Sequence, residues 1–442
     1  MLLLKERKGM RLSIPAPVIK IISILSQEGY EAYAIGEGVR DCLLGLEPQE
    51  LKVASSAPLE VVEAFFDRTF RLQDKVLVRE GETLVHVLSF GEQLSAACSL
   101  SDLLEQDFTV NALAYDPLEG VLIDPWQVSE QIASGEVMIR LVRDPNFCFQ
   151  QVPRRLLKVF YLMKLFDDAG LKWQVFRETE EALVRCAPAA GSIHPHQVRA
   201  LLNRVIVGKR PDIYLDEMRK TGVLRHILPE LNDTYGIEQN DCHIKDVFGH
   251  TLLVMREIRP ELHLRWAGLL HDIGKPQCIS LHEGRVHFYG HQVISSIMAR
   301  RILRRLGFSR GFIEKVSFLV YHHMYPYPKT PKAVRRFINK MGLYNLGDLI
   351  ELRRADILGG KYRNLSNLEY FKREIDSVLF ELPPFSIKNL ALNGFDVMEI
   401  LGIKPGPLVG EALEYLFAKV KENRELNNRE SLTALLKERF GS

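Results

Sequence analysis

The stretch Ile35-Gly36-Glu37-Gly38-Val39-Arg40-Asp41 lies between a short β-rich run, Ala32-Tyr33-Ala34-Ile35, and a predicted helix at residues 42–45. A glycine-rich turn that leads from a strand into a helix presents free backbone N–H groups and a positive dipole end to a phosphate. The stretch therefore predicts an α/β fold around it. Its glycines indicate either a phosphate-binding turn or an ordinary one.

The sequence on both sides of this turn divides the chain into an α/β head and a helical remainder. Further β-rich runs occur at residues 75–78 and 83–88, and a helical stretch at residues 58–66, which predicts a small mixed sheet with helices. From about residue 149 we expect strands to end, because apolar residues such as Leu156, Phe160 and Tyr161 recur every three or four positions. Helix stops then predict four domains: head 15–145, helical neck 146–225, histidine-rich helical domain 226–345 and helical tail 346–442.

Composition excludes several classes of protein. With 46% hydrophobic residues in 442 the chain can bury conventional cores, and 58 basic against 56 acidic residues give a net charge of only +2, so any nucleic-acid surface must be local. The six cysteines show no C-x-x-C spacing, which argues against a zinc knuckle and a disulfide framework. No segment reaches the roughly 18 apolar residues of a membrane span, and the apolar start is too short for a signal peptide. We expect a soluble, cytoplasmic protein.

Histidines are concentrated in one part of the helical remainder. Nine of the thirteen lie between positions 243 and 323. Imidazole nitrogens bind transition metals, and carboxylates add charge and can bridge two ions, so a mixed His/Asp set suits Mn, Fe, Co, Ni or Mg. Such an ion activates water and neutralises phosphate, which favours phosphoester hydrolysis. The alternative interpretation is that these histidines are packed or solvated without a metal. For His263, His282 and His287 we expect solvated side chains that are not ligands.

The order of these residues is similar to that of a known superfamily. His271-Asp272-Ile273-Gly274-Lys275-Pro276, with His250 upstream and Asp356 downstream, resembles the HD metal-dependent phosphohydrolases. The resemblance implies metal ligation by His250, His271, Asp272 and Asp356. Phe288-Tyr289-Gly290-His291 and Tyr321-His322-His323-Met324 resemble the additional histidines of HD domains in tRNA nucleotidyltransferases. His291, His322 and His323 are therefore candidates for a second ion or for phosphate contact. We assign catalytic roles to Asp272 and to Lys275, whose ammonium can meet a phosphate oxygen.

The head resembles the class II tRNA nucleotidyltransferase and bacterial poly(A) polymerase family. Residues 36–57 are similar to its run Gly-Gly-x-Val-Arg-Asp, Leu-Leu-Gly, Asp-x-Asp, Ala-Thr, and residues 107–116 to its Arg-Arg-Asp-Phe-Thr-x-Asn-Ala-Leu block. Residues 393–398 and 404–410 extend the resemblance to the tail. It implies a nucleotidyltransferase-like head, an RNA-binding neck and tail, and ATP or CTP as ligands. The nucleotide-binding residues carried over are Gly36, Gly38, Arg40, Asp107, Asn111 and Arg155.

The head departs from the family pattern at its metal-binding carboxylates. Glu50-Leu51-Lys52 stands in place of Asp-x-Asp, and a third acidic position corresponds to His86. Nucleotidyl transfer uses paired carboxylates to hold two Mg²⁺ ions about 3.5–4 Å apart. A lysine at position 52 puts a cation where a dication should bind, so we expect the transfer site to be inactive unless Asp41 or Asp74 compensates.

Other departures affect nucleotide recognition. Glu37 replaces the second glycine of the first motif, and Glu105-Gln106 replaces two arginines. In the neck, Gln151-Val152-Pro153-Arg154-Arg155 retains the arginine of the family's Glu-Asp-x-x-Arg but has valine in place of its aspartate. We therefore expect templated selection of C or A to fail.

Three functions remain open. The first is an HD phosphohydrolase or phosphodiesterase acting on nucleotide or RNA-end phosphates, with a divalent metal and with RNA, expected to be tRNA, as partner. The second is an active CCA-adding or poly(A)-adding enzyme. The third is a catalytically silent RNA-binding regulator. Arg300, Arg301, Arg304 and Arg305 would form one cationic stripe on a helix, suited to RNA phosphates or simply solvated.

Overall fold

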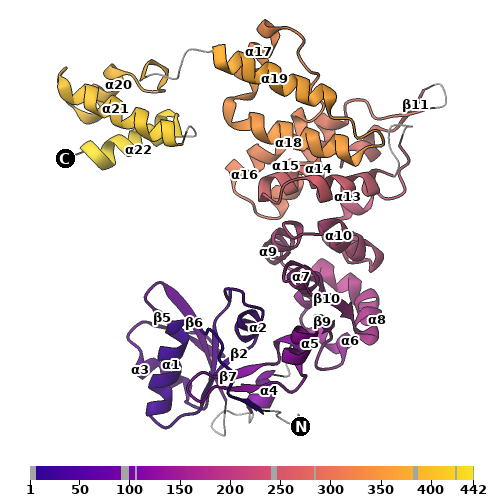
Figure 1. The fold of residues 1–442 in the computed structure, drawn as a ribbon, viewed down its shortest axis with the longest axis vertical. Coiled ribbons are helices and arrows are strands. Elements are labelled where there is room, and N and C mark those ends of the chain that lie inside the picture. Colours follow the sequence, from indigo (N-terminus) through magenta and orange to yellow (C-terminus); the bar gives the residue numbers. More distant parts are fainter. Residues whose placement is uncertain are drawn as a thin grey trace.

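The structure is a computed structural model, and it describes residues 6–90, 99–104, 107–239, 246–282, 285–381, 387–423 and 426–441. Figure 1 shows an elongated molecule in which the chain runs from a head with a sheet, through a helical neck, into a larger helical body. Among the described residues, no helix is long and apolar enough to cross a membrane.

The head is built on an eight-stranded mixed sheet with the strand order β1-β8-β7-β2-β3-β6-β5-β4. The strands are β1 (Glu6–Lys8), β2 (Ala32–Ile35), β3 (Lys52–Ser55), β4 (Thr69–Arg71), β5 (Lys75–Glu80), β6 (Thr83–Ser89), β7 (Ala114–Asp116) and β8 (Val121–Ile123). β3 and β6 pair in parallel, and the other neighbours are antiparallel. Helices α1 (Ala16–Gln27) and α3 (Leu59–Phe65) pack on the sheet through buried apolar residues. The predicted mixed sheet with helices is confirmed.

The turn that follows β2 differs from the prediction in one respect. Helix α2 (Glu37–Leu43) begins at Glu37 and not at residue 42, so the motif itself forms the helix. Gly36 precedes it with a φ of 78°, a conformation that glycine adopts without strain. Two short helices, α4 (Leu100–Leu104) and the 3₁₀ turn η1 (Thr109–Asn111), complete the head.

The neck is mostly helical but contains two strands. Its elements are α5 (Val128–Ser134), β9 (Glu136–Ile139), α6 (Pro145–Gln151), α7 (Arg154–Asp168), β10 (Lys172–Val175), α8 (Arg177–Cys186), η2 (Ala187–Ser192), α9 (Pro195–Ile206), α10 (Pro211–Lys220), α11 (Val223–Ile227) and α12 (Pro229–Asn232). β10 pairs in parallel with β9. The prediction that strands end near residue 149 is therefore wrong, because a four-residue strand is too short to show a clear alternation.

The body contains a second exception, the hairpin of β11 (Ser280–His282) and β12 (Arg285–His287). Its helices are α13 (Val247–Glu257), α14 (Leu262–Leu270), η3 (Lys275–Cys278), α15 (His291–Arg305), α16 (Arg310–His322), α17 (Pro331–Met341), α18 (Leu343–Gly359) and α19 (Ser366–Glu381). The C-terminal elements η4 (Ile387–Asn389), α20 (Gly394–Leu401), α21 (Pro407–Glu422) and α22 (Arg429–Phe440) share their own hydrophobic cluster.

Helices cross every predicted domain boundary. The boundary at 145/146 falls in α6, that at 225/226 in α11, and that at 345/346 in α18. One hydrophobic cluster extends from the head into α19. Prolines such as Pro145, Pro195 and Pro229 begin helices, because proline at the first helical position removes no hydrogen bond.

Candidate functional site

Three helices bring the four residues expected to bind one ion together. His250 comes from α13, His271 and Asp272 follow α14, and Asp356 lies on α18. His250 Nε2 lies 3.3 Å from His271 Nε2 and 3.1 Å from Asp356 Oδ1. His271 Nε2 lies 3.2 Å from Asp272 Oδ2. These four residues, expected to bind one ion, converge in the structure.

A second group shares Asp272. Its other oxygen, Oδ1, lies 3.2 Å from Nε2 of His291 at the start of α15 and 3.7 Å from Nε2 of His323 at the end of α16. The two imidazole Nε2 atoms are 3.3 Å apart. Within each of the groups His250/His271/Asp272 and Asp272/His291/His323, the candidate ligand atoms all lie within 4.8 Å of one another. Asp272 can therefore bridge two cations.

Backbone carbonyls orient all four imidazoles. The Nδ1 atoms of His250, His271, His291 and His323 lie 2.7–3.2 Å from the carbonyl oxygens of Gly359, Gly268, Phe288 and Val320. An Nδ1–H that donates to a carbonyl leaves Nε2 unprotonated in a neutral imidazole and able to bind a metal. Pairs of such nitrogens 3.3 Å apart would repel each other through their lone pairs. A cation between them removes this conflict. A proton can do so, since Asp272 raises the pKa of His271 against the effect of burial, and the same donor set fits a divalent metal.

The charges at Asp272 agree with this assignment. Asp272 is buried, and burial alone would raise its pKa, but His271 and Lys275 hold the pKa well below its ordinary value. Its Oδ2 lies 2.6 Å from the Lys275 ammonium, yet it accepts no hydrogen bond from the described residues. The carboxylate is thus anionic and retains lone pairs for an ion.

His322 does not join either group. Its ring packs against aromatic neighbours, with its centroid 4.5 Å from that of Phe318 and 6.1 Å from that of Tyr325. Burial and the nearby Lys340 lower the pKa of this imidazole. His322 is the last residue of α16 and His323 follows it. Consecutive side chains on a helix point about 100° apart, so only His323 faces Asp272. Of the three candidates for a second ion, the structure brings together His291 and His323.

The expectation that His263 is solvated is wrong. Its side chain is largely covered and its Nε2 lies 2.9 Å from Asp348 Oδ2, in a group with Glu261. The ammonium of Lys315 lies 2.7 Å from the same Asp348 oxygen. The carboxylate already has a cationic partner, so this group needs no metal.

The head contains a pocket of about 450 Å³ beside the Gly36 turn. Among the residues carried over from the family, Gly36, Asp107, Asn111 and Arg155 line it, together with Glu50 and Lys52. Lys52 Nζ lies 3.1 Å from the Glu50 carboxylate. His86 pairs with Lys52 across the parallel β3–β6 ladder, and burial and Lys75 lower the pKa of its imidazole.

Two of the predicted nucleotide-binding residues lie behind the pocket. Arg40 is 0% exposed, and its guanidinium bonds to Asp41 at 2.6 Å and to Asn111 at 2.6 Å. Gly38 packs against the loop before β3, where an added Cβ would lie 2.8 Å from the Glu50 carbonyl oxygen. Arg40 and Gly38 therefore support the turn from behind, and neither residue lines the pocket.

A buried ion network that the sequence did not reveal joins head and neck. Lys158 on α7 contacts the Asp107 carboxylate, and its Nζ lies 2.5 Å from Glu37 Oε1. Although burial opposes it, Lys158 and Arg40 lower the pKa of Glu37 to about 2. Arg154, Lys158 and Tyr161 are spaced to share one face of a helix, and all three line the pocket. This spacing was the one sign in the sequence that Lys158 faces the head.

The remaining sequence departures have mixed outcomes. Asp41 is buried against Arg40 and cannot compensate for the lost carboxylates, whereas Asp74 lines the pocket. Val152 directly follows α6, and Pro153 separates it from α7. Glu105-Gln106 lies outside the described residues.

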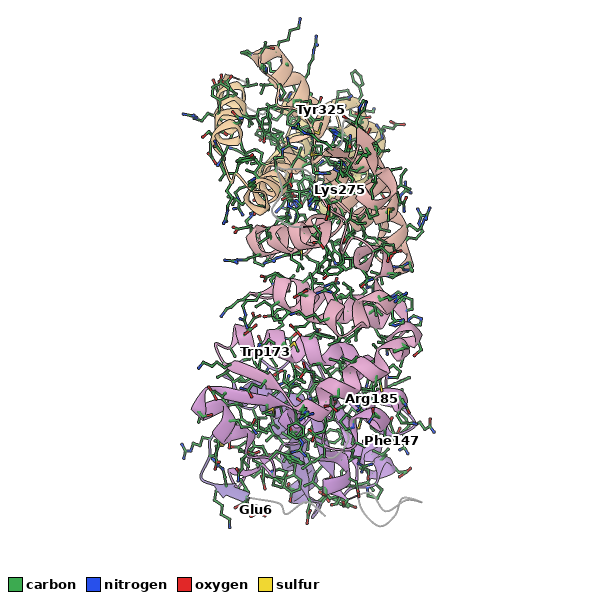
Figure 2. The ribbon with its side chains drawn as sticks, turned by 90° about the vertical axis from the view of Figure 1, so that its right-hand side faces the viewer. Glu6, Phe147, Trp173, Arg185, Lys275 and Tyr325 are labelled. Atoms are coloured by element: carbon green, nitrogen blue, oxygen red, sulfur yellow. The ribbon has the colours of Figure 1, made fainter. Side chains whose placement is uncertain are left out.

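The HD cluster and the head pocket lie in different parts of the molecule. Figure 2 shows Lys275 among the upper helices and Trp173, in the neck, well below it. On α15, Arg300, Arg301, Arg304 and Arg305 are all exposed, but Arg305 forms a two-pronged ion pair with Glu230. Arg300 and Arg304 line a shallow groove with Phe308.

Comparisons with known proteins agree with both parts of this description. The family model for the HD domain matches residues 247–366, and that described as the probable RNA and SrmB-binding site of polymerase A matches residues 174–234. A CC-adding tRNA nucleotidyltransferase of Thermus thermophilus is 30% identical over 430 residues, covering 93% of this chain and 94% of the relative. An A-adding tRNA nucleotidyltransferase of Deinococcus radiodurans is 30% identical over 345 residues, covering 71% of this chain and 74% of the relative.

A solved structure shows the same fold. The Bacillus stearothermophilus CCA-adding enzyme, solved with CTP, has a TM-score of 0.61 and 23% identity, and the match covers 95% of this chain and 96% of that one. With the sequence relative aligned over nearly its whole length, the chain belongs to the tRNA nucleotidyltransferase family and carries an HD domain.

Proposed function

We propose that this protein is a metal-dependent phosphohydrolase or phosphodiesterase that uses its HD cluster on nucleotide or RNA-end phosphates, and that its head no longer transfers nucleotides. The observation that carries the hydrolase proposal is the orientation of four imidazoles by backbone carbonyls toward one shared carboxylate, Asp272.

The residues define how the centre would work. His250, His271, Asp272 and Asp356 would hold one divalent ion, and Asp272, His291 and His323 a second. A bound ion of this kind activates water and neutralises phosphate charge. Lys275 is buried beside Asp272, and its ammonium is a point charge that would suit a phosphate oxygen of the substrate. The His/Asp donor set suits Mn, Fe, Co, Ni or Mg.

Two observations support the loss of transfer. Lys52 holds Glu50 in an ion pair, and among the described residues none of the groups of three potential metal ligands lies in the head. Glu37 and Asp107, which also line the pocket, both contact Lys158. Each of these three carboxylates therefore has a cationic partner in place of a metal.

RNA, and specifically tRNA, is the proposed partner. The relatives from Thermus and Deinococcus are tRNA nucleotidyltransferases, and the neck matches an RNA-binding model over residues 174–234. An RNA held by the neck could present its terminal phosphate to the HD cluster.

Hydrolysis is tested on the purified full chain, loaded in turn with Mn, Ni, Co and Mg, against phosphorylated nucleotides and RNA ending in a cyclic phosphate. We expect phosphate release or ring opening that His271→Ala and Asp272→Ala abolish and that His282→Ala, an exposed hairpin histidine, leaves unchanged. Turnover in the first two variants equal to that of the unaltered protein would exclude the HD cluster as the active site. Tight tRNA binding with no turnover in any metal would favour the regulator instead.

A CC- or A-adding enzyme is the second candidate, favoured by the near full-length match to the Thermus relative. Its test is incubation with tRNA lacking its 3′ terminus and labelled CTP or ATP. We expect no incorporation. Incorporation that Glu50→Ala abolishes would establish transfer and overturn our interpretation of the head.

A further inference from the structure

The head pocket has the size and lining of a nucleotide site. Its volume of about 450 Å³ is within the roughly 300–1,000 Å³ of small-molecule and cofactor pockets. Apolar side chains of Ile35, Leu103 and Leu104 form part of the wall, and the Tyr161 ring lies on the neck side. This combination accommodates a flat heterocycle at one end.

Cations outnumber anions around the pocket. The basic side chains that line it are Lys52, Lys75, Arg154, Arg155, Lys158 and Arg204, against the acidic Glu37, Glu50, Asp74 and Asp107. Within the described part of the chain, no carboxylate lies within 4 Å of Lys75, Arg154 or Arg204. Arg204 instead lies over the Tyr161 ring, 5.3 Å from its centroid. Because the basic side chains outnumber the acidic ones, the pocket attracts an anion.

A divalent ion does not fit this pocket. Glu50 lies 3.1 Å from the Lys52 ammonium, and Glu37 and Asp107 share Lys158. His86, opposite Lys52, has an Nδ1 with no hydrogen-bond partner among the described residues, and it brings no negative charge. A metal here would meet the ammonium of Lys52. Of the four acidic side chains in the lining, Glu37, Glu50 and Asp107 already have a cationic partner, and Asp74 alone cannot provide the paired carboxylates that two metal ions need.

We infer that the head pocket binds a nucleoside triphosphate without a divalent metal, with the Lys52 ammonium as the built-in counter-ion of the phosphate chain. Lys52 projects from the first residue of β3 beside the Gly36 turn, where an added Cβ at Gly36 would lie 4.0 Å from its Cδ. Lys75 and Arg204 supply further charge to the same space. Such a pocket makes the head a nucleotide receptor in a protein whose chemistry takes place at the HD cluster.

This inference concerns a different site from the hydrolase proposal, and the two fail separately. Excess EDTA removes ions from the HD cluster and stops hydrolysis, whereas binding at the head should persist. A protein that hydrolyses phosphoesters but binds ATP only with Mg²⁺ would refute the inference and leave the hydrolase proposal standing.

The binding test is isothermal titration calorimetry of the full chain with ATP, CTP, tripolyphosphate or adenosine, in excess EDTA and again with Mg²⁺. We expect ATP or CTP to bind equally well in both, within about threefold. Tripolyphosphate should bind more weakly, and adenosine should not bind. In EDTA, Lys52→Asp should weaken ATP binding by about tenfold or more, the loss of one charge-assisted hydrogen bond. Lys20→Asp, an exposed lysine on α1 paired with Glu80, should not.

A second measurement needs no variant. Amine acetylation of the unaltered protein in EDTA, read by mass spectrometry, should show that ATP protects Lys52 and Lys75 but not Lys20. Binding that requires Mg²⁺, binding unaffected by Lys52→Asp, or equal labelling of Lys52 with and without ATP would each overturn the inference.

Discussion

The ammonium of Lys275 lies 2.6 Å from Oδ2 of Asp272, in the space beside the carboxylate where an ion is expected to bind. If the Lys275 ammonium serves the substrate phosphate, Lys275→Met should retain the metal but lose one charged contact to phosphate. We expect kcat/KM to fall by about 10- to 100-fold. Phosphoester hydrolysis, measured with metal content in the same samples, checks this. Unchanged kcat/KM would make Lys275 only a counter-ion of Asp272.

Adjacent histidines provide a matched pair for the second ion. His323 Nε2 lies 3.7 Å from Asp272 Oδ1, whereas the His322 ring packs against Phe318. His323→Ala should lower the metal content from two ions per chain to one, and His322→Ala should leave two. Elemental analysis of both dialysed variants measures this. Equal losses in the two would contradict a centre built on His291 and His323.

Arg40 is expected to act through stability and not through nucleotide contact. Its buried guanidinium bonds to Asp41 and Asn111, so Arg40→Met would leave the buried Asp41 carboxylate without its partner. We expect the head to lose about 3–5 kcal/mol of unfolding free energy. Urea denaturation of the full chain, monitored with a probe in the head, tests this. Arg79→Met, which replaces an exposed arginine, is the control. Normal stability combined with weaker ATP binding would restore the role that the family motif implies.

The sequence alone was sufficient for the division into an α/β head and a helical remainder and for the family, because periodicity and short motifs are local properties. It missed β10 and the β11–β12 hairpin, whose strands are too short to show an alternation. His250, His271, Asp272 and Asp356 could be named for the same reason: their pattern matches a superfamily whose fold brings them together. The bridging position of Asp272 between two groups could not be predicted, since it depends on where α15 and α16 end in space. His322 and His323 are neighbours in the sequence, and only the helix direction separates their roles.

In the head, the motif names residues that the fold does not place at the pocket. Arg40 and Gly38 belong to a motif that favours nucleotide contact, yet packing places both behind the pocket. Lys158 follows Arg154 and Arg155 on α7, and its link to Glu37 and Asp107 arises only when α7 packs against the Gly36 turn. The helical spacing of α7 can place Lys158 on one face of the helix, but a single sequence does not show which distant acids that face will meet.

The α15 arginines should contribute to RNA binding according to their partners. Arg300 and Arg304 are exposed beside Phe308, whereas Arg305 is held by Glu230. If tRNA phosphates contact the first two, the double substitution Arg300→Ala/Arg304→Ala should lower the slope of log K against log salt by about 2, about one for each lost phosphate contact. Fluorescence anisotropy over a salt series gives the slope. Arg305→Ala should change it little, and an unchanged slope in the double variant would exclude this surface.

Glu37 should make the stability of the head depend on acid pH. Its pKa falls from an ordinary 4.5 to about 2 in the folded head, against the effect of burial, because Lys158 and Arg40 favour the carboxylate. A lowered folded-state pKa gives stability that is present above about pH 4.5 and is lost as the pH falls toward about 2. The shift corresponds to a contribution on the order of 3 kcal/mol.

Glu37→Gln should therefore be less stable than the unaltered protein at about pH 7, and the difference should shrink toward about pH 3. Urea denaturation across this pH range measures the difference in stability. In a Lys158→Met background most of that difference should disappear, because Glu37 has lost its main cationic partner. A difference between the two proteins that stays constant from neutral to acid pH would show that the Glu37–Lys158 pair does not hold the head to the neck through charge.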